Sequence, residues 1–185
     1  MVRVRYPTLY YAKRFLVLEI KLIFEEVLLK RRSIRKYKDT PIPRDMVLKL
    51  LEAARIAPSA SHKQPWHFIV VENKETIKQL AKSDWAAKAP LMIVGLADQE
   101  ASPNWCSNDL GIAFEHIALA ATSLGLGACW MGQTGREDLI RKLLNVPEKL
   151  IPVAVMPVGV PDETPAPRER KSLASIVSWE KYASP

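Results

Sequence analysis

The sequence predicts a single α+β domain in which helices flank a mixed β-sheet. Runs of β-branched residues alternate with helical patterns, but without the regular spacing of a doubly wound fold. Neither a GxGxxG turn after a first strand nor a GxxxxGK loop is present. The third indication is a long helical stretch that is apolar on nearly every side, which a small domain must bury on most of its surface.

Composition favours one globular domain with a real core, since 48% of the 185 residues are hydrophobic and 25% are charged. The net charge of +7 is local rather than general. Residues 1–38 hold 11 Lys and Arg against 3 acidic residues, a net of +8, so residues 39–185 sum to −1. A nucleic-acid footprint usually follows a whole binding face, so this distribution argues against nucleic acid as the partner.

Membrane, secretion and metal signals are missing from the pattern. The apolar run at residues 15–29 is interrupted by Glu19, Lys21 and two further glutamates, so it does not read as a membrane span, and it lacks a small-residue cleavage site. Cys106 and Cys129 have no CxxC spacing and are expected to be reduced core thiols of a cytoplasmic protein. The three histidines show no metal-ligand spacing.

The chain begins with a basic and aromatic lead-in, residues 1–22, which we interpret as an N-terminal extension to a domain at residues 23–185. From Leu22 onward, apolar residues that include Val27 and Ile34 predict a helix that runs through a basic stretch. The prolines at positions 41 and 43 end this helix.

The later elements are recognised from β-branched runs, helical spacing and chain-breaking residues. They are a helix after Pro43 with Met46, Val47, Leu50, Leu51 and Ala54 on its apolar positions; a loop at 57–61; a buried strand at Trp66–Glu72; a short helix at Glu75–Lys82; a strand at Leu91–Leu96; the apolar helix Asp109–Leu124 with a Gly125 C-cap; a strand at Ala128–Met131; a helix at Glu137–Leu144; and a strand at Pro152–Gly159. A proline-rich connection at 161–167 leads to a tail at 171–182 with enough apolar residues to require docking on this chain or a partner.

Three segments carry candidate binding chemistry. Lys30–Lys38 places six cations around the hydroxyl of Ser33, and forked guanidinium donors beside a hydroxyl suit a phosphate, although a solvated basic face or nucleic-acid patch would share this composition. Residues 58–66 supply hydroxyls and amides that suit a flat polar ligand, or form an ordinary turn. Residues 127–133 have small side chains that permit close backbone approach to a ligand, or plain helix–sheet packing.

Together these segments resemble the nitroreductase superfamily of FMN flavoproteins. The resemblance spans residues 24–182 and rests on motifs that occur in order: Arg31–Tyr37, Ala53–Ala60, Gln64–Phe68, Ala120–Gly132, Val158–Pro161 and Arg170–Leu173, followed by Ile176, Val177, Trp179 and Glu180. It implies a homodimer with two FMN sites at the subunit interface and a C-terminal tail that packs on the partner. That arrangement accounts for the all-round apolar helix and for the apolar tail.

The resemblance also assigns residues. It implies that Arg31 and Ser33 hold the FMN phosphate with Arg32 beside them, and that Arg170 and Lys171 assist from the tail. Arg35 is expected near the N1/O2 edge of the flavin, where a cation favours the negative charge gained on reduction. The remaining expected contacts to the ring are Pro58, Ser59, Ala60 and Gln64, with Pro58, Ser59 and Ala60 coming from the other subunit, and the backbone of Met131, Gly132 and Gln133.

The chain departs from the family pattern in places that affect specificity. His62 and Lys63 stand where many members carry Asn and Arg, and only residues 99–108 are available where longer members carry an insertion over the substrate side of the flavin. That side is therefore expected to be open or lined by Trp105.

The resemblance implies an FMN-dependent oxidoreductase that takes a hydride from NAD(P)H and reduces a nitroaromatic, quinone or similar planar small-molecule acceptor in a ping-pong cycle. Two alternatives stay open from the sequence. One is a specialised branch that acts on a flavin or a halogenated aromatic. The other is a non-catalytic protein that binds FMN or another phosphate ligand.

Overall fold

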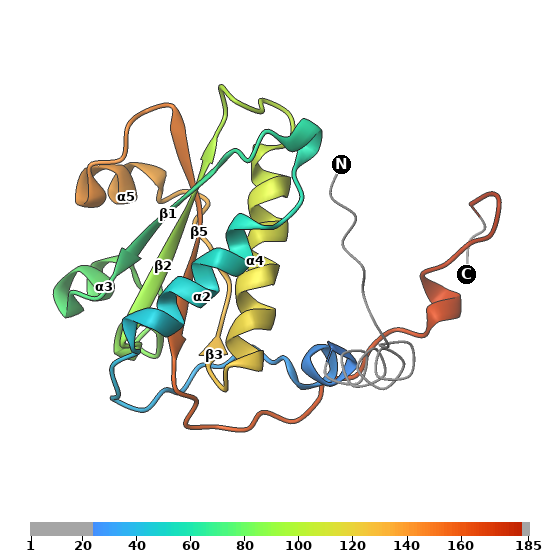
Figure 1. Cartoon of the computed structure of the whole chain (residues 1–185), viewed down its shortest axis with the longest axis horizontal. Coiled ribbons are helices and arrows are strands. Elements are labelled where there is room, and N and C mark those ends of the chain that lie inside the picture. The colour runs from blue at the N-terminus through green and yellow to red at the C-terminus, as the bar shows by residue number, and fades with distance from the viewer. Residues whose placement is uncertain (1–23, 183–185) are drawn as a thin grey trace, which may run out of the picture.

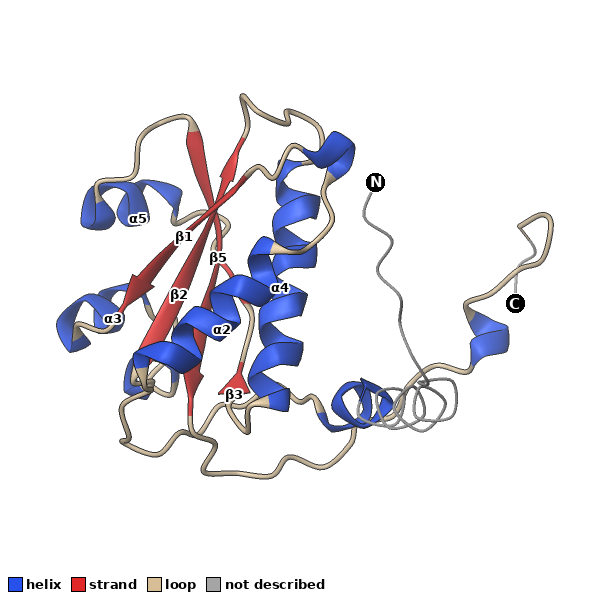
Figure 2. Ribbon diagram, viewed as in Figure 1, coloured by secondary structure: helices blue, strands red, loops and turns tan. Residues whose placement is uncertain are grey.

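The computed structural model describes residues 24–182, so the N-terminal extension predicted at residues 1–22 lies outside the described residues. Residues 24–30 are helical. They are followed by α2 (Arg44–Arg55), β1 (Trp66–Val71), α3 (Lys74–Leu80), β2 (Leu91–Asp98), α4 (Cys106–Ser123), β3 (Gly127–Ala128), β4 (Met131–Gly132), α5 (Glu137–Leu144) and β5 (Leu150–Gly159), with short 3-10 turns at Ala60–His62, Ala86–Lys88 and Leu173–Ser175 (Figure 1). This is the predicted α+β domain, with helices around one sheet (Figure 2).

The strands form one sheet in the order β1–β2–β5–β3, with β4 also paired to β5. The strand pairs are antiparallel, and a parallel bridge between Ser33 and Ala128 gives the sheet its mixed character. β2 is buried along nearly its whole length, whereas β1 is mostly half-buried with only Val71 buried. The prediction of a buried strand at β1 was therefore wrong, because β1 lies at the edge and has a strand partner on one side only.

Alternation along β2 divides the interior into two cores. Leu91 and Ile93 face a core shared with α2 and α4, while Met92 and Val94 face a core shared with α3 and α5. Successive side chains of a strand point to opposite faces, so a fully apolar strand such as β2 requires cover on both sides. Figure 1 shows α2 and α4 together on one side of the sheet and α3 and α5 on the other.

Helix α4 is the central support of the domain. Leu110, Phe114 and Ile117 are fully buried in it, and Gly95 of β2 faces Phe114 so closely that an added Cβ would lie 2.3 Å from the ring. The helix ends as predicted at Gly125, where φ is +71°. It begins three residues earlier than predicted, at Cys106. Within residues 24–182, no helix is long and apolar enough to cross a membrane.

The prediction of a helix through the basic stretch was wrong beyond Lys30. Residues 31–36 are not helical, and the backbone N–H of Ile34 donates to the carbonyl of Ala128 at 3.1 Å. Ile34 is buried directly against Gly127, where an added Cβ would lie 2.7 Å from its side chain. Burial of this β-branched residue at the sheet edge therefore outweighs the helical spacing of Val27 and Ile34.

The single strand predicted at Ala128–Met131 is interrupted in the structure. β3 and β4 both pair with β5 in one continuous register, and Cys129 between them faces Pro157. Cys129 N–H donates to the Pro157 carbonyl at 3.2 Å, but proline has no N–H to return the bond. The ladder therefore breaks at this pair without any shift in register.

Candidate functional site

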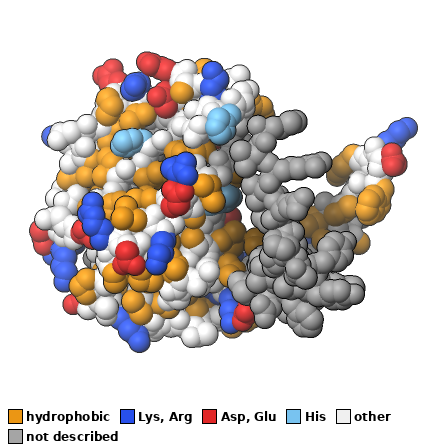
Figure 3. All heavy atoms as spheres, in the orientation of Figure 1, with side chains coloured by type: hydrophobic (Ala, Val, Ile, Leu, Met, Phe, Trp, Pro, Cys, Tyr) orange, Lys and Arg blue, Asp and Glu red, His pale blue; other side chains and the backbone are white. Residues whose placement is uncertain are grey.

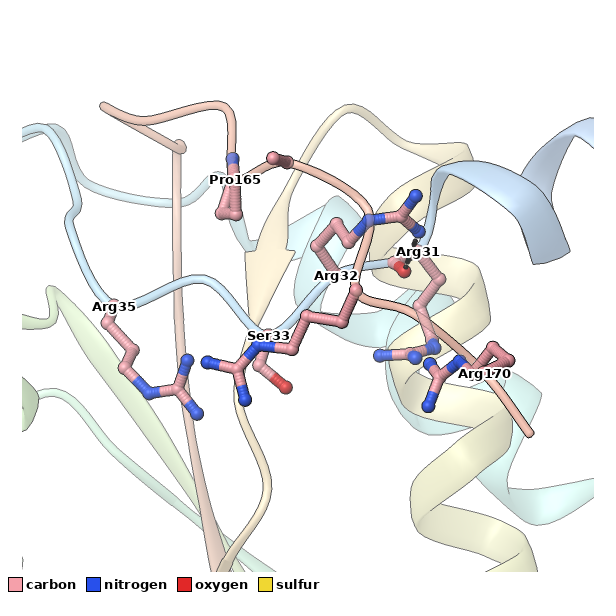
Figure 4. A pocket seen from close by; sticks show the side chains of 8 residues that line it. Arg31, Arg32, Ser33, Arg35, Pro165 and Arg170 are labelled. Atoms are coloured by element: carbon pink, nitrogen blue, oxygen red, sulfur yellow. Dashed lines mark hydrogen bonds between the residues drawn. The ribbon is translucent and has the colours of Figure 1, made fainter.

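A cavity of about 250 Å³ lies where the extended basic stretch meets the chain that returns after β5. Guanidinium groups point into it from both segments (Figure 4). We call it the arginine cavity, and its lining residues are Arg31, Arg32, Ser33, Arg35, Pro165, Ala166, Arg168 and Arg170. This lining contains no acidic side chain, so the cavity is suited to an anion.

The basic stretch is positioned by α4 and by the sheet. Ser33 is fixed by its bridge to Ala128, directly after the C-terminal end of α4. The backbone N–H of Arg31 donates to the Val27 carbonyl at 2.9 Å, which is the last hydrogen bond of the helical residues 24–30. The Nε of Arg31 lies 3.5 Å from Glu115 Oε1 on α4. Glu115 therefore orients Arg31 from outside the arginine cavity.

The returning chain is tied to the basic stretch at consecutive positions. The N–H of Asp162 donates to the Lys36 carbonyl at 2.9 Å, and Lys36 Nζ lies 2.9 Å from Asp162 Oδ2. Glu163 Oε1 accepts from the N–H of Arg35 at 2.5 Å and of Lys36 at 3.1 Å. The hydrogen bond between the Lys36 and Asp162 side chains raises the pKa of Lys36 and lowers the pKa of Asp162. These ties bring Arg168 and Arg170 beside Ser33.

The Arg32 side chain, which lines the arginine cavity, has one donor atom without a hydrogen-bond partner within residues 24–182. Its Nη1 donates to the carbonyls of Leu29 at 2.6 Å and of Arg31 at 2.8 Å. Its Nε is buried and has no hydrogen-bond partner among the described residues. A buried cationic donor without a partner is costly, and a bound anion would satisfy it.

A second cavity, of about 740 Å³, shares Arg35 with the first. We call it the tryptophan cavity, and its lining residues are Arg35, Lys36, Tyr37, Ser83, Asp84, Trp85 and Lys88. The Arg35 guanidinium carbon lies 5.7 Å from the centroid of the Trp85 ring. Sequence reasoning missed the segment 83–88, because nothing in its local pattern marks a contact to a residue some 50 positions earlier.

Cys129 and Tyr37 are two titratable groups that interact electrostatically with Arg35. Burial raises the pKa of the Cys129 thiol, against the opposing effects of Arg35 and of a hydrogen bond with Ser33, so the thiol stays neutral. Cys106 and Cys129 are both free and buried, as predicted. Burial also raises the pKa of Tyr37, whose hydroxyl donates to the Ile34 carbonyl at 2.5 Å.

No group of acidic, His and Cys side chains within residues 24–182 is arranged to hold a metal ion.

The peptide groups of β4 are not equivalent. Gln133 N–H is taken by the Val153 carbonyl at 2.9 Å, and its side chain is buried with Oε1 accepting from Arg136. Antiparallel ladders alternate, so the N–H of Gly132 points away from β5. Lys82 Nζ donates to the Gly132 carbonyl at 2.5 Å, and because the N–H and C=O of one strand residue point to the same side, the N–H of Gly132 also faces away from β5. Among Met131, Gly132 and Gln133, it is therefore Gly132 that offers a free-facing N–H.

The loop predicted to contact a flat ligand, residues 58–66, lies at the beginning of α4 and lines neither cavity. Ala60 N–H donates to both carboxylate oxygens of Asp109, at 3.1 and 3.2 Å, near the beginning of α4. Ser61, His62 and Gln64 have φ values of 49°, 56° and 49°, and Gln64 N–H donates to Ser59 Oγ at 2.9 Å. These bonds fix the loop's shape.

One chain does not bring this loop to the arginine cavity. The loop lies at the first turn of α4 and Ser33 lies beyond its last turn, and the 15 residues from Asp109 to Leu124 rise roughly 22 Å. Figure 1 shows the two segments at opposite ends of α4. The structure therefore brings only part of the predicted site together in one chain. The arginine cavity is lined by the predicted residues Arg31, Arg32, Ser33, Arg35 and Arg170, and the loop with Pro58, Ser59, Ala60 and Gln64 lies away from it. Lys171 is exposed outside that lining, and Arg168, Pro165 and Ala166 join it although the sequence pattern did not single them out.

The tail leaves the domain after the arginine cavity. Its apolar side chains, Leu173, Ile176, Val177, Trp179 and Tyr182, are exposed, and Figure 3 shows hydrophobic atoms on the projecting segment. An apolar groove of about 390 Å³ lies between the helical residues 24–30 and the helices α2 and α4; it is lined by Phe24, Val27, Ala53, His116, Leu119, Ala120 and Ser123. Tail and groove are unpartnered apolar surfaces of the kind that mark interfaces.

Comparisons with known proteins agree with this geometry. The model of the nitroreductase family matches residues 28–88 and 77–160. A relative from Methanothermobacter thermautotrophicus, with the name "Putative NADH dehydrogenase/NAD(P)H nitroreductase", is 41% identical over 153 residues, which cover 78% of this chain and 80% of that protein.

Two solved structures are similar along most of the chain. An FMN-dependent nitroreductase from Clostridium difficile R20291 is 34% identical with a TM-score of 0.71, covering 85% of this chain and 96% of that one. The NADPH:FMN oxidoreductase of Vibrio harveyi, complexed with NAD+, is 25% identical with a TM-score of 0.81, covering 88% and 79%. With the family match extending from the basic stretch to the end of β5, the chain belongs to the nitroreductase family.

Proposed function

We propose that the protein is an FMN-dependent oxidoreductase that uses NAD(P)H. The observation that carries this proposal is the junction of two unlike cavities at Arg35. The arginine cavity has the size and charge for a phosphate, and the larger tryptophan cavity has an aromatic wall and room for a flat ring system. FMN has this construction, with an anionic end joined to a planar ring.

The residues of the arginine cavity fit the FMN phosphate. Ser33 and Arg32 line the cavity, and Arg31 and Arg170 add positive charge from the two segments that meet there. Arg168 is a further contact that the cavity lining supports. Each charge-assisted hydrogen bond contributes about 1.5–3 kcal/mol, so a few of them suffice for firm binding.

Bound FMN would supply the hydride chemistry, and the protein's residues would orient the ring and tune its charge. Arg35 lies between the two cavities, where its guanidinium favours negative charge on the ring edge. The outward N–H of Gly132 is the donor on β4 that remains for a ring nitrogen. No side-chain acid or base is required for hydride transfer itself.

We further propose that the working unit is a homodimer in which each site uses both chains. A second copy would bring Pro58, Ser59, Ala60 and Gln64 to the ring, since one chain holds them at the far end of α4. It would also cover the apolar groove and the tail residues. Both arrangements bury surfaces that are unpartnered in the single chain.

The proposed cycle is ping-pong. NAD(P)H reduces the flavin and leaves, and a nitroaromatic, quinone or similar planar acceptor then takes the same face. Support for NAD(P)H and for a nitroaromatic as the two substrates comes from the NAD+ complex of the Vibrio harveyi relative and from the nitroreductase names of other relatives. The open cavity beside Trp85 would admit a planar acceptor without a lid.

An absorption spectrum of the purified protein tests the proposal. We expect a flavin band that NADH or NADPH bleaches without oxygen and that menadione or nitrofurazone restores. Reduction and reoxidation in separate half-reactions would support the ping-pong cycle. A colourless protein that cannot be reconstituted with FMN would overturn the enzyme assignment.

A further inference from the structure

Arg35 makes one contact through its backbone and one through the end of its side chain. Its backbone N–H donates to Glu163, and its guanidinium carbon lies 5.7 Å from the Trp85 ring centroid. This distance is within the range of a cation–π interaction, for which indole is the best aromatic partner. Among the ion pairs described for residues 24–182, none involves the Arg35 guanidinium, and the indole is the aromatic ring that it faces.

Trp85 is well supported for such a role. It precedes the short turn Ala86–Lys88, in which Ala86 is fully buried. The Ala86 N–H donates to the Ser83 carbonyl at 3.0 Å, and the Lys88 N–H to the Trp85 carbonyl at 3.3 Å. The turn is followed after two residues by β2, an interior strand of the sheet. The indole is therefore carried by a hydrogen-bonded turn that is anchored in the core by Ala86.

We propose that Trp85 is a positioning residue, which fixes the Arg35 guanidinium at the junction of the two cavities and through it sets the reduction potential of the bound flavin. This inference rests on the FMN site proposed above. Arg carries several rotatable bonds, and on an open surface it would spread over many rotamers. The effect of a charge falls with distance, so a guanidinium that samples solvent would stabilise a reduced ring less than a fixed one.

The test compares Trp85→Leu with Trp85→Phe in the full-length, FMN-loaded protein. Both substitutions shrink the side chain, but only phenylalanine keeps an aromatic face for the guanidinium. We expect Trp85→Leu to lose about tenfold in the preference for reduced over oxidised FMN, which lowers the two-electron potential by about 30 mV. Trp85→Phe should retain most of the wild-type potential.

A double-mutant cycle establishes whether Trp85 acts through Arg35. In an Arg35→Gln background, Trp85→Leu should cause no further change in potential, because the group it positions has been removed. A fall of equal size in that background would show a direct effect of the indole on the ring and overturn the proposal. An unchanged or raised potential in the single Trp85→Leu variant would overturn it as well.

The affinity for oxidised FMN separates this inference from the proposed function. We expect Trp85→Leu to retain binding of oxidised FMN, and to lose less affinity than Arg31→Ala, because it removes a wall of the tryptophan cavity but leaves the phosphate contacts of the arginine cavity intact. If the wild-type protein fails to bind FMN, the proposed function itself is wrong. If wild type binds FMN and the potential does not respond to Trp85→Leu, only the positioning role is wrong.

Discussion

Glu163 accepts a hydrogen bond from the backbone N–H of Arg35, at 2.5 Å between Oε1 and N, although the two residues stand 128 positions apart in the chain. The same oxygen accepts from Lys36. A carboxylate thus occupies a pair of adjacent peptide donors, and the returning chain is fixed beside the basic stretch. Glu163 organises the arginine cavity without lining it.

Replacing Glu163 should therefore weaken FMN binding from outside the site. Glu163→Ala leaves two N–H groups without their anion and frees the segment that carries Arg168 and Arg170. We expect FMN affinity to fall about tenfold, the equivalent of about 1.4 kcal/mol. Titration of the apoprotein with FMN measures the effect. Glu169→Ala, an exposed acid on the same segment, is the matched control. Equal affinities for both variants and wild type would contradict this role.

Removing a cavity arginine should lose FMN without unfolding the protein. Arg31→Ala and Arg170→Ala each remove a charge-assisted phosphate contact of about 1.5–3 kcal/mol, so affinity should fall roughly ten- to hundredfold. Thermal unfolding of the apoproteins checks that the fold is intact. Arg44→Ala, at the exposed start of α2, should bind FMN normally. If either cavity variant kept wild-type affinity, its assignment to the phosphate would fail.

Arg35 should affect chemistry more than affinity. Arg35→Gln removes positive charge at the junction of the cavities, so it should lower the flavin potential and slow reduction by NAD(P)H. Its loss of FMN affinity should be smaller than that of Arg31→Ala. Stopped-flow reduction and an equilibrium potential decide between roles. Lost FMN binding with an unchanged potential would make Arg35 a phosphate ligand instead.

The tail should be required for both dimer and cofactor. A chain that ends at Pro167 lacks Arg170 and the exposed apolar residues of the tail. We expect it to be monomeric and free of flavin in sedimentation velocity at micromolar concentration. As a point test, Leu173→Asp should weaken the dimer, whereas Leu139→Asp on exposed α5 should not. A stable wild-type monomer with FMN bound would refute the shared site.

Gly95 should be indispensable for seating α4 on the sheet. An added Cβ would lie 2.3 Å from the Phe114 ring, which is fully buried and cannot move freely. Gly95→Ala should therefore destabilise the fold by about 1–3 kcal/mol in urea unfolding. Gly132→Ala, where a Cβ meets open space, serves as the comparison. Similar unfolding midpoints for the two variants would disprove the packing argument.

Much of the fold could be predicted from local patterns. α5 occupies Glu137–Leu144 as predicted, because its apolar spacing is strong and Asn145 ends it in a left-handed conformation. The helix through Ile34 was mispredicted because the competing interaction, a bridge from Ser33 to Ala128, joins residues far apart in sequence. Local spacing contains no record of such a partner.

The candidate site also contains residues that the sequence predicted and residues that it did not. The motif around Ser33 and the tail arginine Arg170 did come together in one cavity, as the family resemblance implied. Trp85 was not predicted, because its importance lies in facing Arg35 across space. The roles assigned to individual residues toward FMN remain predictions for the experiments above.

The distance along α4 between the Asp109-bound loop and Ser33 has a thermodynamic consequence. If each flavin touches both chains, FMN and the partner subunit are linked ligands, and each must strengthen the binding of the other by the same factor. Dilution would then release cofactor even when free FMN is held constant, and saturating FMN would hold the dimer together at concentrations where the apoprotein falls apart. The flavin would serve as a reversible cross-link as well as an electron carrier.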